Sequence, residues 1–593
     1  MECKARNEMN PAYQWDFSHI YPTYEAWETA YAKAQAATAE LSTLPGTLGT
    51  SPESLKSALD KVYEAAEKAE LVSLYAFLHK SSDNGDSKNQ TMEGRAVQLG
   101  MALQAATAFI DPELLSIDKD TLDAWLQLDL LKGYRHMIED TTRGAAHILD
   151  AEKEQMLAML GDAAGTPRNA FDMLESVDMT FPPVHDENGN EIPLTHGTYG
   201  VYLHSRSPEV RKEAYETYFK EFGKYINTFS SLYAGSVKFD TFYARVRGYS
   251  SACEAALFHS NVPVSVYDSL IEAIHGGLPI MKRYLALRKK MLGLDSLGMY
   301  DLYCPMVDDV EYPATFEEGM DLVHKATAPL GARYQELLDM AEKNHWMDVY
   351  ENKGKTTGAF SCGVHGVHPY VLLNYTDTLQ DAYTLAHELG HAMHSYLSSE
   401  KQDFANHRYR ILVAEVASTV NEVLLTKYLL SVETDKKRRA YILNHFLEEF
   451  RTTVFRQTLF AEFERKAHDA YMNGQPLTAE LLNGMYRELN LKYYEGADVG
   501  ELHDIEWARI PHFYNAFYVY QYATGFCSAV AIANRILETG DATDYLNFLA
   551  TGGSDYPLEE LKIAGVDLTK PDTVANALKV FDETLKELEE LLG

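Results

Sequence analysis

Apolar residues recur every three to four positions along most of this chain, with polar residues between them. Residues 51–80, SPESLKSALDKVYEAAEKAELVSLYAFLHK, begin with a Ser-Pro-Glu start signal and continue with this spacing, which is typical of an amphipathic helix. The same pattern predicts further helices over residues 207–243, 264–292, 315–343, 379–399, 408–431, 435–473, 478–490, 516–538 and 571–592. The sequence therefore predicts a mostly α-helical protein.

Strand signals are few and local. The segment DENGNE (186–191) separates MTFPPV from IPLTHGTYGVYL, and an Asn-Gly pair between two such runs is typical of a β-hairpin. A second candidate strand is PYVLLNY (369–375), whose backbone we expect to pair with an extended peptide. The chain has no solenoid repeat or low-complexity tract, and its least helical stretch, 160–200, marks the expected domain boundary.

The composition is that of a globular protein and restricts its partners. The 593 residues are 46% hydrophobic, and 53 Lys and Arg against 87 Asp and Glu leave a formal net charge of −34. This charge repels phosphate backbones and anionic membrane surfaces, so we expect neither nucleic acid nor membrane as a partner. No apolar run is long enough for a transmembrane span, and the N-terminus lacks the apolar core of a secretory signal.

The cysteines indicate the compartment. They are odd in number, widely scattered and without a C-x-x-C pair, so we expect neither a disulfide framework nor a cysteine zinc site. A reducing cytoplasm fits this usage best. The five positions are Cys3, Cys253, Cys304, Cys362 and Cys527.

The candidate chemistry lies at residues 387–391, which read His-Glu-Leu-Gly-His inside the helical pattern 379–399. Positions i and i+4 share a helix face, so His387 and His391 point toward one metal ion, and imidazole nitrogen suits Zn²⁺. Glu388 lies beside them and is the candidate general base for a water that attacks a carbonyl. Apolar and small neighbours indicate a buried helix, where these polar side chains need partners; this favours a metal site over a solvated surface helix.

A catalytic zinc needs a third protein ligand and an open position. The extended pattern H-E-x-x-H-x-x-G-x-x-H is excluded, because His394 and Leu397 stand where glycine and histidine belong. Of the glutamates that follow, Glu400 comes too early for the chain to turn back. Glu415 and Glu422 lie seven residues apart in LVAEVASTVNEVLL and share a helix face. Spacing does not choose between them; we expect one to bind the metal and the other to orient a ligand.

The segment GAFSCGVHGVHPY (358–370), just before the metal helix, is rich in glycine. Gly363 and Gly366 serve either as turn residues or as places where this segment approaches a ligand. We expect His365 and His368 to be surface residues rather than site residues.

Several segments, in the same order along the chain, resemble one known family. HELGHAMH, followed by AEVASTVNE, resembles the thimet-type oligopeptidases, the zinc metallopeptidases of the M3 family, and in particular the oligoendopeptidase F branch. The resemblance covers nearly the whole chain. The other segments that carry it are WDFSHIYPTYEAWE (15–28), RKEAYETYFKEF, ARVRGYSSACEAAL, MYDLYCP, PYVLLNY, HFYNAFYVYQYATGF and FLATGGSDYPLEELKIAGVD.

The resemblance implies a role for each residue of the metal motif. His387 and His391 match the two histidine ligands of one zinc ion per chain, and Glu388 matches the catalytic base. Glu415 matches the third ligand, because the family's glutamate begins an E-x-x-S pattern and Ser418 follows it here.

Family members also hold the negatively charged oxygen of the reaction with a histidine and tyrosines from a C-terminal loop and helix. His512 matches that histidine. Aligning YQYATG assigns Tyr518 and Tyr522, with a one-residue shift relative to His512. A phenol or an imidazolium donates a hydrogen bond to the carbonyl oxygen as charge develops on it. The alternative donors in this stretch are Tyr514 and Tyr520.

The resemblance implies a mostly α, two-lobed metallopeptidase with a deep central cleft and a small β element beside the zinc helix. We expect an N-terminal helical lobe over 1–200 and a catalytic domain over 201–593. The expected function is a cytoplasmic zinc metalloendopeptidase that hydrolyses internal bonds of short oligopeptides. Two alternatives stay open: an exopeptidase with a cationic group for the substrate's terminal carboxylate, and a non-catalytic peptide-binding protein with a structural metal.

Overall fold

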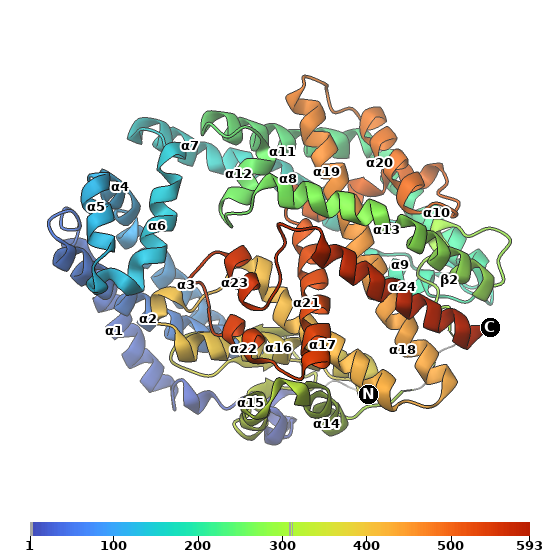
Figure 1. The fold of residues 1–593 in the computed structure, drawn as a ribbon, viewed down its shortest axis with the longest axis horizontal. Helices are drawn as coiled ribbons and strands as arrows, with labels where there is room; N and C mark the ends of the chain where they lie inside the picture. The colour runs from blue at the N-terminus through green and yellow to red at the C-terminus, as the bar shows by residue number, and fades with distance from the viewer. Residues whose placement is uncertain (1–3, 308–309, 311) are drawn as a thin grey trace. The chain divides into compact units, whose positions relative to one another are not determined.

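The computed structural model describes residues 4–307, 310 and 312–593, and helices dominate it (Figure 1). The chain forms two compact units, each assembled from three stretches of sequence. Unit 1 comprises Met1–Ala145, Tyr312–Leu429 and Ile532–Val566, and unit 2 comprises Ala146–Glu311, Leu430–Ala531 and Asp567–Gly593. The expected functional division at residue 200 stays a prediction, as does the deep central cleft.

Unit 1 contains the metal motif and a small sheet. Its strands are β3 (Met347–Asp348), β4 (Phe360–Cys362) and β5 (Tyr370–Leu372). Its helices are α1 (Tyr24–Glu40), α2 (Pro52–Ser82), α3 (Ser87–Thr107), α4 (Ile110–Ser116), α5 (Lys119–Leu126), α6 (Arg135–Arg143), α14 (Phe316–Thr327), α15 (Ala332–Lys343), α16 (Leu379–Lys401), α17 (Ile411–Val432), α22 (Thr543–Leu549) and α23 (Pro557–Ile563).

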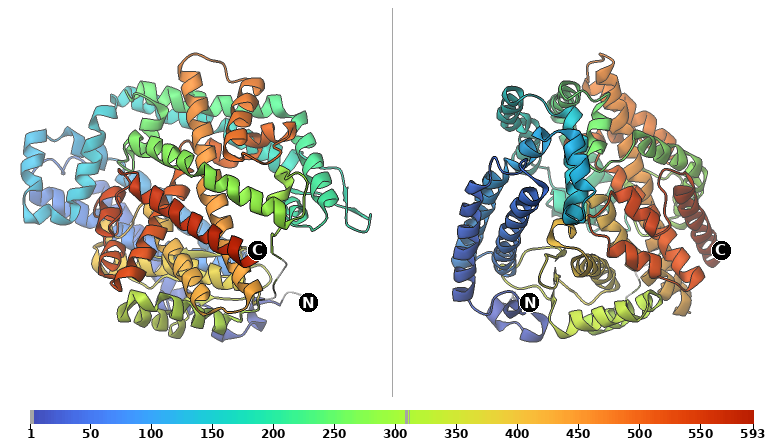
Figure 2. Two further views of the ribbon diagram at one scale, coloured as in Figure 1. Left: turned by 45° about the vertical axis from the view of Figure 1, so that its right-hand side comes forward. Right: turned by 60° about the vertical axis from the view of Figure 1, so that its left-hand side comes forward.

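The N-terminal helices of unit 1 show how the sequence builds its core. The Ser51 side chain accepts the N–H of Ser54, and Pro52 occupies the first turn, so α2 begins with a favourable cap. Apolar side chains at helical spacing, among them Leu55 and Leu59, are buried in a cluster between neighbouring helices. Helices α1, α2 and α3 therefore pack side by side (Figure 2).

The small sheet of unit 1 lies against the motif helix. Its strand order is β3-β5-β4, with β3 parallel and β4 antiparallel to β5. Trp15 pins the sheet, because its indole N–H donates to the carbonyls of Trp346 and Val371 (3.0 and 2.9 Å). Both β4 and β5 contact α16, which confirms the expected β element beside that helix.

In the part of unit 2 that the structure describes, the strands form one hairpin, β1 (Val184–His185) and β2 (Glu191–Ile192), which are antiparallel and confirm the prediction around DENGNE. In Figure 1, α24 lies between α13 and α18, both of which it contacts. The helices are α7 (Ala151–Ala164), α8 (Thr166–Met173), α9 (His196–Leu203), α10 (Pro208–Lys224), α11 (Ile226–Val246), α12 (Ala252–Phe258), α13 (Val264–Met291), α18 (Lys436–Glu449), α19 (Arg456–Met472), α20 (Ala479–Tyr493), α24 (Asp572–Leu592) and most of α21 (Tyr520–Thr539).

The prediction of a mostly α-helical protein is confirmed, but the structure interrupts some of the expected helices. Residues 207–243 form α10 and α11, which are separated at Tyr225. Residues 435–473 form α18 and α19, joined by a π-helical turn at Phe450–Phe455. Hydrophobic periodicity continues across such short interruptions, so the pattern does not reveal them.

Two further properties bear on the sequence predictions. Within residues 4–307 and 312–593, no helix combines the length and apolar character that a membrane span requires. Cys253, Cys304, Cys362 and Cys527 are free thiols, and Cys3 lies outside the described residues.

Candidate metal centre

The metal motif lies on α16, whose first turn is fixed by a reciprocal cap. The Thr378 hydroxyl accepts the N–H of Asp381 (3.3 Å), and the Asp381 carboxylate accepts the N–H of Thr378 (3.0 Å). This cap satisfies N–H groups that a helix start otherwise leaves unpaired. The helix follows closely on β5, so the sheet and the cap together fix the direction in which His387 and His391 project.

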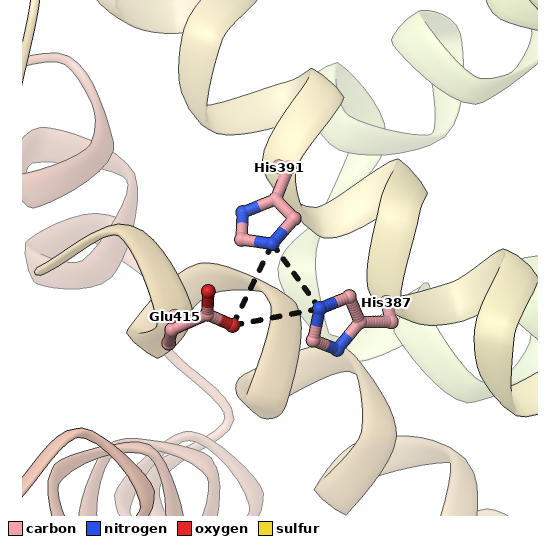
Figure 3. A group of neighbouring side chains, drawn as sticks. All are labelled: His387, His391 and Glu415. Atoms are coloured by element: carbon pink, nitrogen blue, oxygen red, sulfur yellow. Dashed lines mark hydrogen bonds and ion pairs between the residues drawn. The ribbon is translucent and has the colours of Figure 1, made fainter. Parts of the chain in front are cut away.

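Three side chains from α16 and α17 converge on one point (Figure 3). The Nε2 atoms of His387 and His391 are 3.2 Å apart, and Glu415 Oε2 lies 3.5 Å from the first and 3.7 Å from the second. Ligand atoms about 2.1 Å from a tetrahedral zinc ion stand about 3.4 Å from one another. The two imidazole nitrogens and the carboxylate oxygen therefore fit a zinc ion in spacing and in chemistry.

Glu422, two turns further along α17, contacts the other nitrogen of His387. Its Oε1 atom lies 3.0 Å from His387 Nδ1, so Nδ1 donates the hydrogen bond and Nε2 is the nitrogen left to face a metal. Glu415 and Glu422 thus meet opposite sides of one imidazole ring. Glu400, the third glutamate considered from the sequence, instead forms an ion pair with Arg333.

Two residues that the sequence analysis did not single out bring α16 and α17 together. A Cβ atom on Gly390 would lie 2.6 Å from the Cα of Ser418, so only glycine allows this approach. Asn421, fully buried, donates to the carbonyl of Ala386 (2.9 Å) and accepts the hydroxyl of Tyr334 (2.9 Å). The signal for Asn421 was a polar residue in an apolar run; nothing in the sequence distinguished Gly390 from an ordinary small residue.

Burial and neighbouring charges separate the pKa values of the motif residues. Burial opposes the charged form of His387, but the hydrogen bond and charge of Glu422 outweigh it and raise the His387 pKa to about 9. Burial lowers the pKa of His391 to about 3 and raises the pKa of Glu388 to about 7. Glu388, only 7% exposed, is thus a carboxyl group able to gain and lose a proton near neutral pH.

Sequence similarity to known proteins extends over nearly the whole chain. Residues 201–580 match the model of peptidase family M3, and residues 113–181 match that of oligopeptidase F. The chain belongs to peptidase family M3. It is therefore a hydrolase of peptide bonds from a metallopeptidase family.

Relatives of this M3 peptidase match it along nearly their full length. Oligopeptidase PepF of Bacillus subtilis is 44% identical over 591 residues, which cover 99% of this chain and 88% of that protein. An oligoendopeptidase F homolog of Lactococcus lactis is 40% identical over 597 residues, or 99% of each chain. The crystal structure of oligoendopeptidase-F from Enterococcus faecium superposes with a TM-score of 0.73 at 34% identity, covering 96% of this chain and 99% of that one.

The expected oxyanion residues of this M3 peptidase gather within unit 2. His512 lies in the short 3-10 helix Pro511–Tyr514, and its Nε2 atom is 3.5 Å from the hydroxyl of Tyr522 on α21. The Tyr518 ring lies between them in sequence, with centroids 6.4 Å from His512 and 5.5 Å from Tyr522. Burial lowers the pKa of His512 below its usual 6.5, so the free ring is mostly neutral at pH 7.

The two alternative tyrosines are packed rather than grouped with His512. Tyr520 is 2% exposed, and its ring centroid lies 5.3 Å from that of Tyr267. The Tyr514 ring lies 4.7 Å from Phe171. Burial raises the pKa of both hydroxyls above the usual 10. Their surroundings therefore favour Tyr518 and Tyr522 as the tyrosines available to a ligand.

The expectation that PYVLLNY (369–375) pairs with a peptide is wrong for its strand, β5. This strand is the middle one of the sheet, so its backbone is already paired with β3 on one side and β4 on the other. Gly363, directly after β4, is needed for a close approach to α16, because a Cβ there would lie 2.4 Å from the Cβ of Ser395. Gly366, with φ of 86°, is a turn glycine.

The remaining histidines near the motif have structural partners. His394 is buried and stacks on Tyr409, with ring centroids 3.6 Å apart. His365 forms a 2.6 Å ion pair with Glu67, and His368 stacks on Trp346 with centroids 5.0 Å apart. These partners account for the three side chains without a role at the metal.

Proposed function

We propose that this M3 peptidase is a zinc endopeptidase that cleaves internal bonds of short peptides, and that His387, His391 and Glu415 hold one zinc ion. The observation that carries the proposal is the convergence of these three donor atoms beside the buried carboxyl of Glu388. When bound, zinc lowers the pKa of a water molecule and polarises the carbonyl of the scissile bond.

The chain's own residues orient groups and move protons. Glu388 takes a proton from the attacking water onto a carboxylate oxygen and delivers it to the leaving nitrogen. Burial raises the pKa of this carboxyl, which makes it a stronger base for the first transfer. The His512 ring and the hydroxyls of Tyr518 and Tyr522 donate hydrogen bonds to the substrate oxygen as negative charge develops on it.

The relatives support the proposed substrate class. Their names, oligopeptidase and oligoendopeptidase, support short peptides and internal cleavage for this chain as well. A deep cleft that excludes folded proteins, a cytoplasmic location and independence from nucleic acid stay predictions.

Product mapping tests the proposal. Zinc-loaded wild type, Glu388→Gln and Glu400→Gln are each incubated with a peptide length series, and products are identified by mass spectrometry. We expect internal cuts by wild type and by Glu400→Gln. Glu400 lies on the same helix, but it pairs with Arg333 and is not one of the three candidate metal ligands. We expect kcat to fall by about 10²- to 10⁴-fold in Glu388→Gln, with zinc still bound.

Two outcomes would contradict the proposal. Stepwise loss of residues from one end of the peptides would identify an exopeptidase instead. Full turnover by Glu388→Gln would remove this carboxyl from the mechanism.

A further inference from the structure

Phe517, directly before Tyr518, has a left-handed backbone with φ of 58°. The other non-glycine residues described with positive φ are polar: Asn261, His345 and Asp377. For a bulky apolar residue this region is unfavourable, because Cβ comes too close to the following carbonyl oxygen. Such a conformation persists only where the surroundings enforce it, and it concentrates at functional sites.

A buried carboxyl group on α19 enforces this conformation. Glu464 Oε1 accepts the backbone N–H of Phe517 at 2.7 Å, and the Glu464 side chain is fully buried. The Phe517 ring, 2% exposed, lies 4.6 Å from the His468 ring and 5.6 Å from Tyr267, measured between centroids. Since Glu464 and His468 are one turn apart, the same face of α19 holds both the backbone and the ring of Phe517.

Phe517 and Tyr518 belong to the loop 511–519, and α19 also anchors the other end of this loop. Phe513 is buried, and its ring lies 5.5 Å from Phe460 and 5.1 Å from Phe463. The two buried anchors, Phe513 and Phe517, alternate with more exposed neighbours, namely His512 before the first and Tyr518 after the second. Holding the anchors on α19 therefore sets where these two neighbours project.

The burial of Glu464 costs folding free energy. Its Oε2 atom has no hydrogen-bond partner among the described residues, and no described ion pair includes Glu464. Burial raises its pKa well above the usual value and so disfavours the charged form. An apolar side chain would fill the same volume without this penalty, but it would leave the Phe517 N–H unpaired.

We propose that Glu464 and Phe517 form a clamp that positions His512 and Tyr518 to donate hydrogen bonds to the substrate oxygen. Glu464 is thus a positioning residue and does not itself touch substrate. The inference rests on the proposed function, in which these two side chains stabilise the developing charge.

Three variants on α19 test the clamp: Glu464→Leu, Glu464→Gln and Glu462→Leu. Glu464→Leu removes the acceptor, and we expect kcat to fall by about 10- to 100-fold while KM changes by about twofold or less. Glu464→Gln keeps an acceptor oxygen, so kcat stays within about threefold of wild type. Zinc content, measured by mass spectrometry, stays at one per chain in all three.

Glu462→Leu is the matched control. Glu462 lies on the same helix, is 8% exposed and accepts hydrogen bonds from Tyr493 (2.8 Å) and His275 (2.6 Å), neither of which lies in the 511–519 loop. We expect this change to lower the melting temperature and to leave kcat unchanged. Equal loss of kcat in Glu462→Leu and Glu464→Leu would show general destabilisation and overturn the clamp.

Combined variants separate a failure of the clamp from a failure of the proposed function. In the His512→Ala and Tyr518→Phe backgrounds, we expect Glu464→Leu to lower kcat less than it does in wild type, because the groups that it positions are already gone. If the single variants His512→Ala and Tyr518→Phe both keep the wild-type kcat, the oxyanion roles are overturned, and the clamp with them. If these two single variants lose kcat while Glu464→Leu keeps the wild-type kcat, the clamp is overturned and the oxyanion roles stand.

Phe517→Leu tests the clamp from the loop side if Glu464→Leu does not fold. It keeps the backbone N–H and reduces the ring contacts with His468 and Tyr267. We expect a lower kcat with zinc still bound. Wild-type kcat in this variant, together with a lower melting temperature, would overturn the clamp.

Discussion

A single imidazole ring, that of His387, is held from both sides by glutamates of one helix. Glu415 Oε2 lies 3.5 Å from its Nε2 atom, and Glu422 Oε1 lies 3.0 Å from its Nδ1 atom. The outer hydrogen bond fixes the tautomer and makes the inner nitrogen a better metal ligand. The two carboxylates are therefore not interchangeable, although both flank the same ring.

Zinc titrations of Glu415→Ala and Glu422→Ala test this difference. We expect Glu415→Ala to lose stoichiometric zinc, because it removes a donor atom. We expect Glu422→Ala to keep one zinc per chain with an affinity about 10- to 100-fold lower, because it removes only the hydrogen bond that orients His387. Competition with a chelator of known affinity measures both. Retention of zinc by Glu415→Ala with loss in Glu422→Ala would reverse the two roles.

At this scale helical spacing predicted the motif but did not choose between the glutamates; only the family resemblance named Glu415 as the expected ligand. His387 and His391 are separated by four residues of one helix, so their common face follows from helical geometry. Glu415 and Glu422 share a face of α17 equally well. Their roles depend on how α17 lies against α16, which is set by Gly390 and Asn421 and is not encoded in any spacing.

Glu560 on α23 provides a pH-dependent prediction. It is 1% exposed, and neither carboxyl oxygen has a hydrogen-bond partner among the described residues. Burial raises its pKa from 4.5 to about 8. The folded protein therefore holds a proton that the unfolded chain releases above pH 4.5, so the free energy of unfolding falls by about 1.4 kcal/mol per pH unit between about pH 4.5 and pH 8.

Glu560→Gln replaces this group with a neutral side chain of the same shape. We expect its melting temperature to exceed that of wild type increasingly as pH rises from 5 to 8, and to approach it at pH 4.5. Glu559→Gln, on the exposed neighbour, is the control and should show no such trend. A Glu560→Gln difference that is constant across this pH range would contradict the raised pKa.

Among the elements, the close contact between α16 and α17 determines how Glu415 lies relative to His387 and His391. Gly390 to Ala would place a methyl group 2.6 Å from the Cα of Ser418 and 2.7 Å from the carbonyl oxygen of Ala417. Both of those atoms belong to the backbone of α17 and cannot rotate away. The helices must then separate, which moves Glu415 away from the histidines of α16.

We expect Gly390→Ala to destabilise the protein by about 1–3 kcal/mol and to weaken zinc binding by about 10-fold or more. Helix propensity alone favours alanine, so the sign of the effect is diagnostic. Gly94→Ala in α3 is the control, since a Cβ there meets nothing within 4 Å; it should gain about 0.5–1 kcal/mol. Thermal unfolding and zinc titration measure both, and equal behaviour of the two variants would refute the role of the contact.

Elements were predictable where their pattern is local. Long amphipathic stretches such as residues 51–80 and 571–592 became α2 and α24, and the Asn-Gly turn became the β1–β2 hairpin. The place of β5 in its sheet was not predictable. Both neighbours of a middle strand come from elsewhere in the chain, here Met347–Asp348 and Phe360–Cys362, and periodicity carries no information on strand order.

For the whole molecule, metal removal should separate activity from folding. Contacts within the protein already join α16 to α17, through Asn421 and the Gly390 approach. We therefore expect the chelated protein to lose activity and keep its helical circular dichroism. Zinc at 1,000 times its Kd should add about 4 kcal/mol of stability, visible as a higher melting temperature. Glu415→Ala should show no such zinc-dependent increase, and loss of helix content on chelation would contradict a preformed site.

The interleaving of the two units has a consequence for synthesis on the ribosome. By residue 432 the nascent chain has all of α16 and α17, but it lacks Ile532–Val566, the last stretch of unit 1. That stretch includes α22, which packs on α16. During synthesis there is thus a long interval in which the surface of α16 that α22 covers, including the side of His394 that faces Phe548, is exposed. Neither unit can be finished as an independent product of translation, and completion of both is deferred until most of the polypeptide has been made.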